Sequence, residues 1–193
     1  MNNYTKVKLV GYTQPSEDFK DHFTDIKDLV AYCARVSNPS NQLNSETSEK
    51  LINYLLKHKH FSPFEMASLT VEVETTRDIA RQLLRHRSFT FQEFSQRYAD
   101  PTKDLNFVTR EARLQDLKNR QNSVKIDNEG LQKQWGDYQA KVVFAATEAY
   151  KWAVENGIAK EQARVVLPEG NTMSRLYVQG TIRSFLHYIE VRK

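Results

Sequence analysis

The change of hydrophobic spacing at Thr76 most constrains how this chain can fold. Before it, in Ser68–Thr75, aliphatic residues alternate with polar ones (LTVEVET), which is the period of a strand with one solvated face. After it, as far as Arg87, the apolar residues recur at helical spacing. A half-solvated strand that leads directly into a helix indicates an α+β fold.

Similar patterns predict the other elements. Strands or extended segments are predicted at Lys6–Tyr12, Phe89–Tyr98 and Arg175–Gly180. Helices are predicted from a Thr24 cap to about Val36, from near Ser45 to the KHKHFSPFE loop, over Gln132–Asn156 with Gly157 as C-cap, from Ala159 towards Pro168, and over Thr181–Arg192. The stretch from about Pro101 to Gly130 is polar and is predicted to be a loop or excursion. Since no internal repeat is found, we expect one domain over residues 1–193.

Composition excludes several classes of protein. The charge is only +4, from 28 Lys and Arg against 24 Asp and Glu, and is spread along the chain, so charge alone does not indicate nucleic-acid binding. The single cysteine, Cys33, excludes an intrachain disulfide or a multi-thiolate metal site, and we interpret it as a small buried hydrophobe. The sequence has no long apolar run and no signal peptide, which predicts a cytoplasmic protein without a membrane segment.

The densest functional pattern is Arg85-His86-Arg87, followed after seven residues by Ser95-Gln96-Arg97. Guanidinium groups form forked, charge-assisted hydrogen bonds to phosphate and stack on planar rings. Such a cluster suits an anionic ligand with aromatic rings. On charge alone, however, a solvated basic face is the better explanation, because most runs of charge are of that kind.

The spacing in RHRSFTFQEFSQR decides between these explanations, because it resembles the signature of the flavin-dependent thymidylate synthases. Four further segments resemble that family in the expected order: ARVS at 34–37, HFSPFE at 60–65, EQARVVLP at 161–168 and TIRSFLHYIEVR at 181–192. The resemblance covers nearly the whole chain apart from the polar excursion. It implies a single α+β domain with a mostly antiparallel sheet and flanking helices.

The resemblance also implies which residues bind the ligands. Those expected to contact FAD are Ser37, His60, Ser62, Glu65, Arg85, His86, Arg87, Ser88, Gln92, Glu93, Thr181, Arg183 and His187. Those expected to contact dUMP are Gln82, Arg85, Glu93, Ser95, Arg97, Arg164 and Arg192. Among them Arg97 and Arg164 match phosphate ligands, and Arg192 matches an arginine that stabilises charge on the uracil and is the catalytic candidate. No metal site is expected.

The implied reaction converts dUMP to dTMP with 5,10-methylenetetrahydrofolate as one-carbon donor, reduced FAD as hydride source and NADPH as reductant. No protein nucleophile is needed, and Ser95 is interpreted as a dUMP contact. The family assembles as homotetramers with shared active sites. Met66 and His187 depart from the family's usual histidine and asparagine, and the chain ends at Lys193, where relatives usually continue with a further polar helix.

Two other functions were weighed on the residues alone. His58, His60, Glu65 and His86 are of metal-ligand type, which would suit a metal-dependent hydrolase. Phe89, Phe91, Phe94 and Tyr98 alternate with basic residues, as in an RNA-binding module with stacking platforms. Neither hypothesis is supported by a complete motif.

Overall fold

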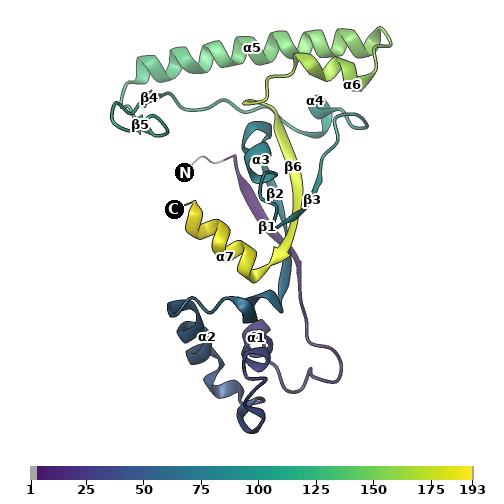
Figure 1. The fold of residues 1–193 in the computed structure, drawn as a ribbon. Coiled ribbons are helices and arrows are strands. Elements are labelled where there is room, and N and C mark those ends of the chain that lie inside the picture. The colour runs from purple at the N-terminus through teal and green to yellow at the C-terminus, as the bar shows by residue number, and fades with distance from the viewer. Residues whose placement is uncertain (1–3, 193) are drawn as a thin grey trace. The chain divides into compact units, whose positions relative to one another are not determined.

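The computed structural model describes residues 4–192, which form two compact units that we treat separately (Figure 1). Unit 1 comprises residues 4–6, Glu74–Arg85 and Glu93–Leu176, and unit 2 comprises Val7–Val73, His86–Gln92 and residues 177–192. The strands of the main sheet lie in the order Lys6–Tyr12, Ser68–Thr76, Met173–Thr181 and Thr90–Glu93. The combination of helices with an antiparallel sheet confirms the predicted α+β class.

The elements lie close to the predicted positions. The main sheet consists of β1 (Lys6–Tyr12), β2 (Ser68–Thr76), β3 (Thr90–Glu93) and β6 (Met173–Thr181). The helices of unit 2 are α1 (Ile26–Ala34), η1 (Pro39–Asn41), η2 (Ser45–Thr47), α2 (Ser48–Lys57), η3 (Ser62–Glu65) and α7 (Ile182–Val191). Unit 1 holds α3 (Arg77–Leu83), α4 (Pro101–Asp104), β4 (Arg113–Gln115), β5 (Ser123–Lys125), α5 (Glu129–Glu155), α6 (Lys160–Ala163) and η4 (Arg164–Val166). Lys193, after which relatives usually continue with a further helix, lies outside the described residues.

The core of unit 2 is formed where α1 and α2 pack against η3. Val30, Leu55, Phe64 and Ala67 are buried there, and Leu186 of α7 packs against them. The cap of α1 corrects the sequence prediction, because Asp25 rather than Thr24 accepts the hydrogen bonds of the first turn. Thr24 instead donates its backbone N–H and its hydroxyl to Asp28.

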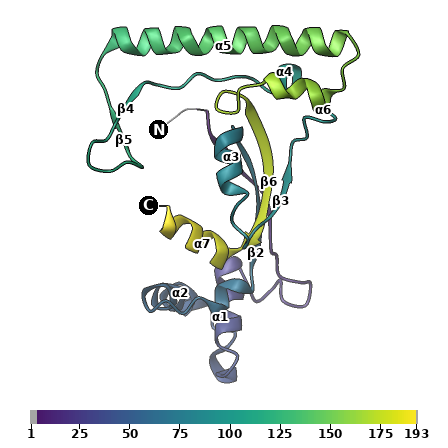
Figure 2. The same cartoon turned by 45° about the horizontal axis from the view of Figure 1, so that its top comes forward.

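The core of unit 1 lies between α5 and α6, which run side by side in both views (Figure 2). Tyr150, Ala153, Ala163 and Leu167 are buried together there. α5 begins at Glu129, earlier than predicted, because the side chain of Asn128 caps it. Gly157, with a φ of 78°, follows the helix as predicted.

The segment predicted as a polar loop is more ordered than its composition suggested. It contains α4 and an antiparallel hairpin in which Leu114 of β4 pairs with Val124 of β5. Two glutamines of α5 form the hydrogen bonds to the backbone of this segment that a neighbouring strand would otherwise form. Gln139 accepts from the N–H of Arg110 and donates to its carbonyl, at 2.8 and 2.9 Å, and Gln132 does the same for Ala112, at 2.7 and 2.9 Å. Hydrogen bonds from polar residues therefore order the backbone of this segment, although most of its residues are exposed.

α3 ends sooner than predicted, at Leu83 rather than Arg87. Arg85, His86 and Arg87 therefore belong to the turn before β3, not to the helix. The turn is closed by the N–H of Phe89, which donates to the carbonyl of His86 at 3.3 Å. No helix within residues 4–192 is long and apolar enough to cross a membrane.

Candidate active site

Unit 2 contains most of the residues predicted to contact the flavin. Glu65, at the end of η3, forms an ion pair with Arg183 in the first turn of α7. The two elements are also joined by the backbone, since the N–H of Ile182 donates to the carbonyl of Ala67 at 2.9 Å. Thr181 caps α7 by accepting from the N–H of Ser184. Two predicted flavin segments that are far apart in the sequence are thus brought together.

His60 takes its position from an unusual helix end. α2 closes with a Schellman motif, in which the N–H of Lys59 donates to Leu56 and that of His60 donates to Leu55, at 3.2 and 2.9 Å. Lys59 occupies the left-handed position of the motif with a φ of 57°, where glycine is usual. The strained backbone presents His60 as an exposed side chain at the start of the HFSPFE segment.

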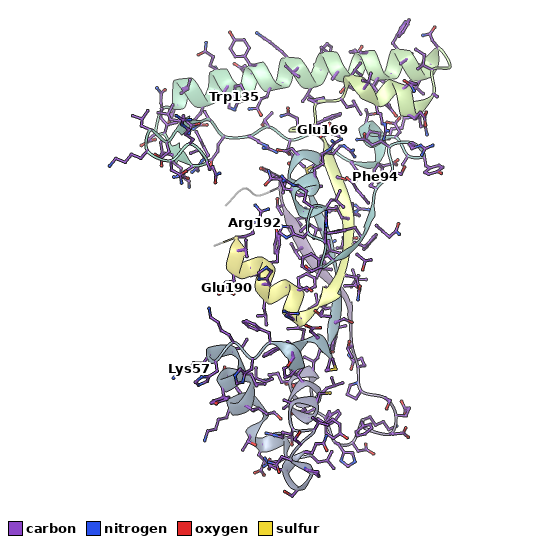
Figure 3. The ribbon with its side chains drawn as sticks, viewed as in Figure 1. Lys57, Phe94, Trp135, Glu169, Glu190 and Arg192 are labelled. Atoms are coloured by element: carbon purple, nitrogen blue, oxygen red, sulfur yellow. The ribbon has the colours of Figure 1, made fainter. Side chains whose placement is uncertain are left out.

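His86 and Arg192 lie in direct contact. Arg192 Nη2 is 3.3 Å from His86 Nε2, and because a guanidinium can only donate, Nε2 is the acceptor of this hydrogen bond. The ring of Tyr188 meets that of His86 edge-on at 4.8 Å. Figure 3 shows Arg192 at the C-terminal end of α7, beside Glu190. The predicted catalytic arginine is therefore next to the central histidine of the motif.

The turn that carries this histidine is held by aromatic packing. Phe89 is buried, and its ring centroid lies 4.7 Å from that of Phe185 and 5.9 Å from that of Tyr188. Gly180 of β6 touches the same ring so closely that a Cβ atom there would lie 2.5 Å from Phe89 Cδ1. Glycine is required at this position by close approach.

Unit 1 contains all but one of the residues predicted to contact dUMP, the exception being Arg192. Arg97 Nε donates to Glu161 of α6 at 3.1 Å, and Arg164 follows α6 directly. The two predicted phosphate ligands are therefore linked through one short helix. Arg164 also lines a pocket of about 380 Å³.

Within residues 4–192, the contacts of Ser95 do not include the base that a nucleophilic serine needs, and its role as a dUMP contact stays a prediction. Its hydroxyl accepts from the backbone N–H of Arg97 at 3.3 Å, and among residues 4–192 no base contacts it. Cys33 is the other nucleophile type. It is a free, half-buried thiol on α1, and burial raises its pKa, so little thiolate forms near neutral pH.

Glu93 has two partners that the sequence did not suggest. Ser174 of β6 is fully buried and donates its hydroxyl to Glu93 Oε1 at 2.9 Å. Arg77, the first residue of α3, places Nη1 3.5 Å from the same oxygen. No local pattern connects it with Glu93, because the contact depends on how α3 and β3 are placed in the tertiary structure.

A pocket of about 630 Å³ contains none of the predicted site residues. It lies in unit 1 and is lined by residues such as Lys6, Glu74 and Arg110. Several other predicted residues have exposed side chains, namely Ser37, Ser62, Gln82, Arg85, Arg87, Ser88, Gln92 and His187. Their roles stay predictions.

The two rival functions find no support in the structure. No group of three or more His, Cys, Asp or Glu side chains that could hold a metal ion is found among residues 4–192. Phe89, proposed as a stacking platform for RNA, is buried in the aromatic cluster. Phe94 lies on the segment after β3 and is half-buried (Figure 3), while Tyr98 is exposed. The aromatic residues therefore do not form one exposed platform.

Comparison with known proteins gives one consistent result. The family described as "Thymidylate synthase complementing protein" matches residues 19–193. A probable flavin-dependent thymidylate synthase of Paramecium bursaria Chlorella virus 1 is 47% identical over 185 residues, which cover 96% of this chain and 83% of that protein. The flavin-dependent thymidylate synthase of Synechocystis sp. is 44% identical over 186 residues, which cover 96% and 84%.

A solved structure extends the comparison to the fold. It is that of PolB, a UMP/dUMP methylase from Streptomyces cacaoi, bound with 5-Br dUMP. It superposes with a TM-score of 0.73 at 27% identity and covers 95% of this chain and 76% of that one.

Proposed function

The chain belongs to the flavin-dependent thymidylate synthase family, and from this membership we propose that it converts dUMP to dTMP with FAD as its cofactor. The observation that carries the proposal is the 47% identity to a probable flavin-dependent thymidylate synthase over 96% of the chain. The complete RHR and SQR motif lies within the aligned family region. 5,10-Methylenetetrahydrofolate is proposed as the one-carbon donor.

The donor set in unit 2 fits a flavin nucleotide. Arg183 and Arg87 offer guanidinium groups to a diphosphate, and the hydroxyls of Ser62 and Thr181 suit a sugar-like chain. When bound, FAD would supply the hydride for reduction of the transferred carbon. The Glu65–Arg183 pair would hold the arginine in place while part of its fork faces the ligand.

For dUMP, we propose that Arg97 and Arg164 bind the phosphate and that Arg192 faces the uracil. An arginine at the uracil stabilises negative charge that develops on the ring, and it does so best when its orientation is fixed in advance. His86 supports such an orientation by accepting from Arg192 at 3.3 Å. The structural neighbour PolB was solved with a halogenated dUMP, which supports a uridylate ligand for this fold.

Two finer features belong to the same proposal. NADPH is proposed as the reductant and a homotetramer as the assembly. Large apolar side chains exposed on unit 1 support assembly, among them Val165 at 84%, Phe144 at 70% and Trp152 at 62% exposure. Subunit contacts would also help to enclose ligands of this size.

The decisive experiment measures dTMP by mass spectrometry after incubation with dUMP, methylenetetrahydrofolate and NADPH at low oxygen, with and without FAD. We expect FAD-dependent dTMP, lost in Arg192→Ala and partly kept in Arg192→Lys. Lys151→Ala is the matched control, because it removes a positive charge from the exposed face of α5. No dTMP from folded, FAD-loaded protein would contradict the proposal.

A further inference from the structure

A compact charge network surrounds Glu93 in unit 1. Arg77 Nη1 is 3.5 Å from Glu93 Oε1, and Arg77 Nε is 3.7 Å from Glu169 Oε1. Arg81, one turn further along α3, pairs with Glu169 at 2.6 Å. Glu169 lies just before β6 (Figure 3). Two arginines thus balance two glutamates, and only Arg77 touches both.

Arg77 is the inner member of this network. Its side chain is only 12% exposed, against 60% for Arg81, and that of Glu93 is 24% exposed. Its backbone is fixed too, since its N–H donates to the carbonyl of Thr172 at 2.9 Å. Charges with little access to water interact more strongly than surface pairs do. Removing Arg77 would leave a poorly solvated carboxylate without its counter-charge.

Both contacts to Glu93 are made at one carboxylate oxygen. Ser174 and Arg77 share Oε1, and among residues 4–192 no other group bonds to this carboxylate. Oε2 is therefore free to accept a hydrogen bond from an external donor. The anchoring of one oxygen fixes the direction in which the other points.

We propose that Arg77 is a positioning residue for nucleotide binding, which holds Glu93 in one orientation and neutralises its charge. The inference rests on the proposed function, in which Glu93 contacts dUMP. An ionised carboxylate near an anionic nucleotide would repel it unless a cation compensates the charge. With Arg77 in place, Glu93 can accept a hydrogen bond from a hydroxyl or N–H of dUMP without that penalty.

The test is a double-mutant cycle on FAD-loaded protein, with the dissociation constant of dUMP measured by calorimetry. Arg77→Met should weaken dUMP binding about tenfold. The double variant Arg77→Met with Glu93→Gln should bind no more weakly than Glu93→Gln alone, because the uncompensated charge is gone. Arg77→Lys, which keeps the charge, should restore most of the affinity. Arg81→Met is the matched control, since it removes an arginine from the same helix and the same Glu169 but contacts no part of Glu93.

A purely structural role for Arg77 predicts different results. Arg77→Met would then lower the melting temperature as Arg81→Met does, and the dUMP affinity would not change. That outcome would refute the positioning role of Arg77 but not the proposed function. Additive losses in the double variant would refute the positioning role as well. If Arg77→Met does not fold, the dUMP affinities of Arg77→Lys and Arg77→Gln are compared under conditions where the two variants are equally stable. Equal affinities would refute the positioning role of Arg77. Failure of the unchanged protein to bind dUMP would instead refute the proposed function.

Discussion

Substitution of Gly180 by alanine tests whether close packing at β6 maintains the site turn. The added Cβ would lie 2.5 Å from Cδ1 and 2.9 Å from Cε1 of Phe89, well inside van der Waals contact. The ring cannot withdraw freely, because it is buried and Phe185 lies 4.7 Å away. Either the ring or strand β6 must therefore move.

The magnitude follows from this geometry. Overpacking a filled core costs about 1–3 kcal/mol, and the enclosed ring places Gly180→Ala in the upper half of that range. Because His86 and Ser88 flank the same turn, the displacement should also reduce the FAD retained after gel filtration. Urea unfolding gives the free energy, and flavin absorbance gives the occupancy.

A matched control carries the same chemical change elsewhere. Gly136 lies inside α5, and its added Cβ would meet nothing within 4 Å. Gly136→Ala should therefore stabilise the protein by about 0.5–1 kcal/mol through helix propensity. In Gly180→Ala, a second change of Phe89 to Leu should recover part of the loss. Wild-type stability and FAD content in Gly180→Ala would refute the reasoning.

Three further predictions concern local stability. Tyr150 is fully buried and its hydroxyl has no hydrogen-bond partner among residues 4–192, so Tyr150→Phe should stabilise by about 1 kcal/mol in urea unfolding, and a loss would reveal a hidden partner. Lys59→Gly should raise the melting temperature and increase the free energy of unfolding by about 1 kcal/mol, because glycine adopts the left-handed φ of 57° without strain. An unchanged melting temperature would show that Lys59 is not strained at this position. Burial raises the pKa of Asp78, but hydrogen bonds from Arg110 and Thr76 outweigh it, so the folded-state pKa is lowered. The stabilisation is therefore present above about pH 4 and lost as pH falls through the folded pKa, and the melting difference between wild type and Asp78→Asn should shrink from pH 7 to pH 3.

The sequence predicted those elements whose pattern is local. The alternation in β2 and the long apolar stripe of α5 each placed an element within a few residues of its observed bounds. The end of α3 was missed because helical spacing continues past Leu83, whereas the turn that follows carries Phe89, which packs into an aromatic cluster. That packing is a tertiary effect, which a window of sequence does not contain.

The order within the polar segment could not be predicted for a different reason. Gln132 and Gln139 look like the solvated face of α5, yet they hydrogen-bond the backbone at Ala112 and Arg110. Polar residues are usually exposed, so a sequence alone predicts that these glutamines face solvent; it does not contain their tertiary contacts. Candidate site residues could be named only through the family motif. Arg77, which pairs with Glu93, lies outside that motif, and the pair forms only in the tertiary structure of unit 1.

The interleaving of the two units has a consequence for biosynthesis. Unit 2 takes its first strand from the start of the chain, whereas α7, whose Ile182 and Leu186 complete its core, is synthesised near the end. Residues of unit 1 are translated in between. The nascent α1–α2 pair therefore leaves the ribosome with part of its apolar surface uncovered, and it must wait for α7 before that surface can close.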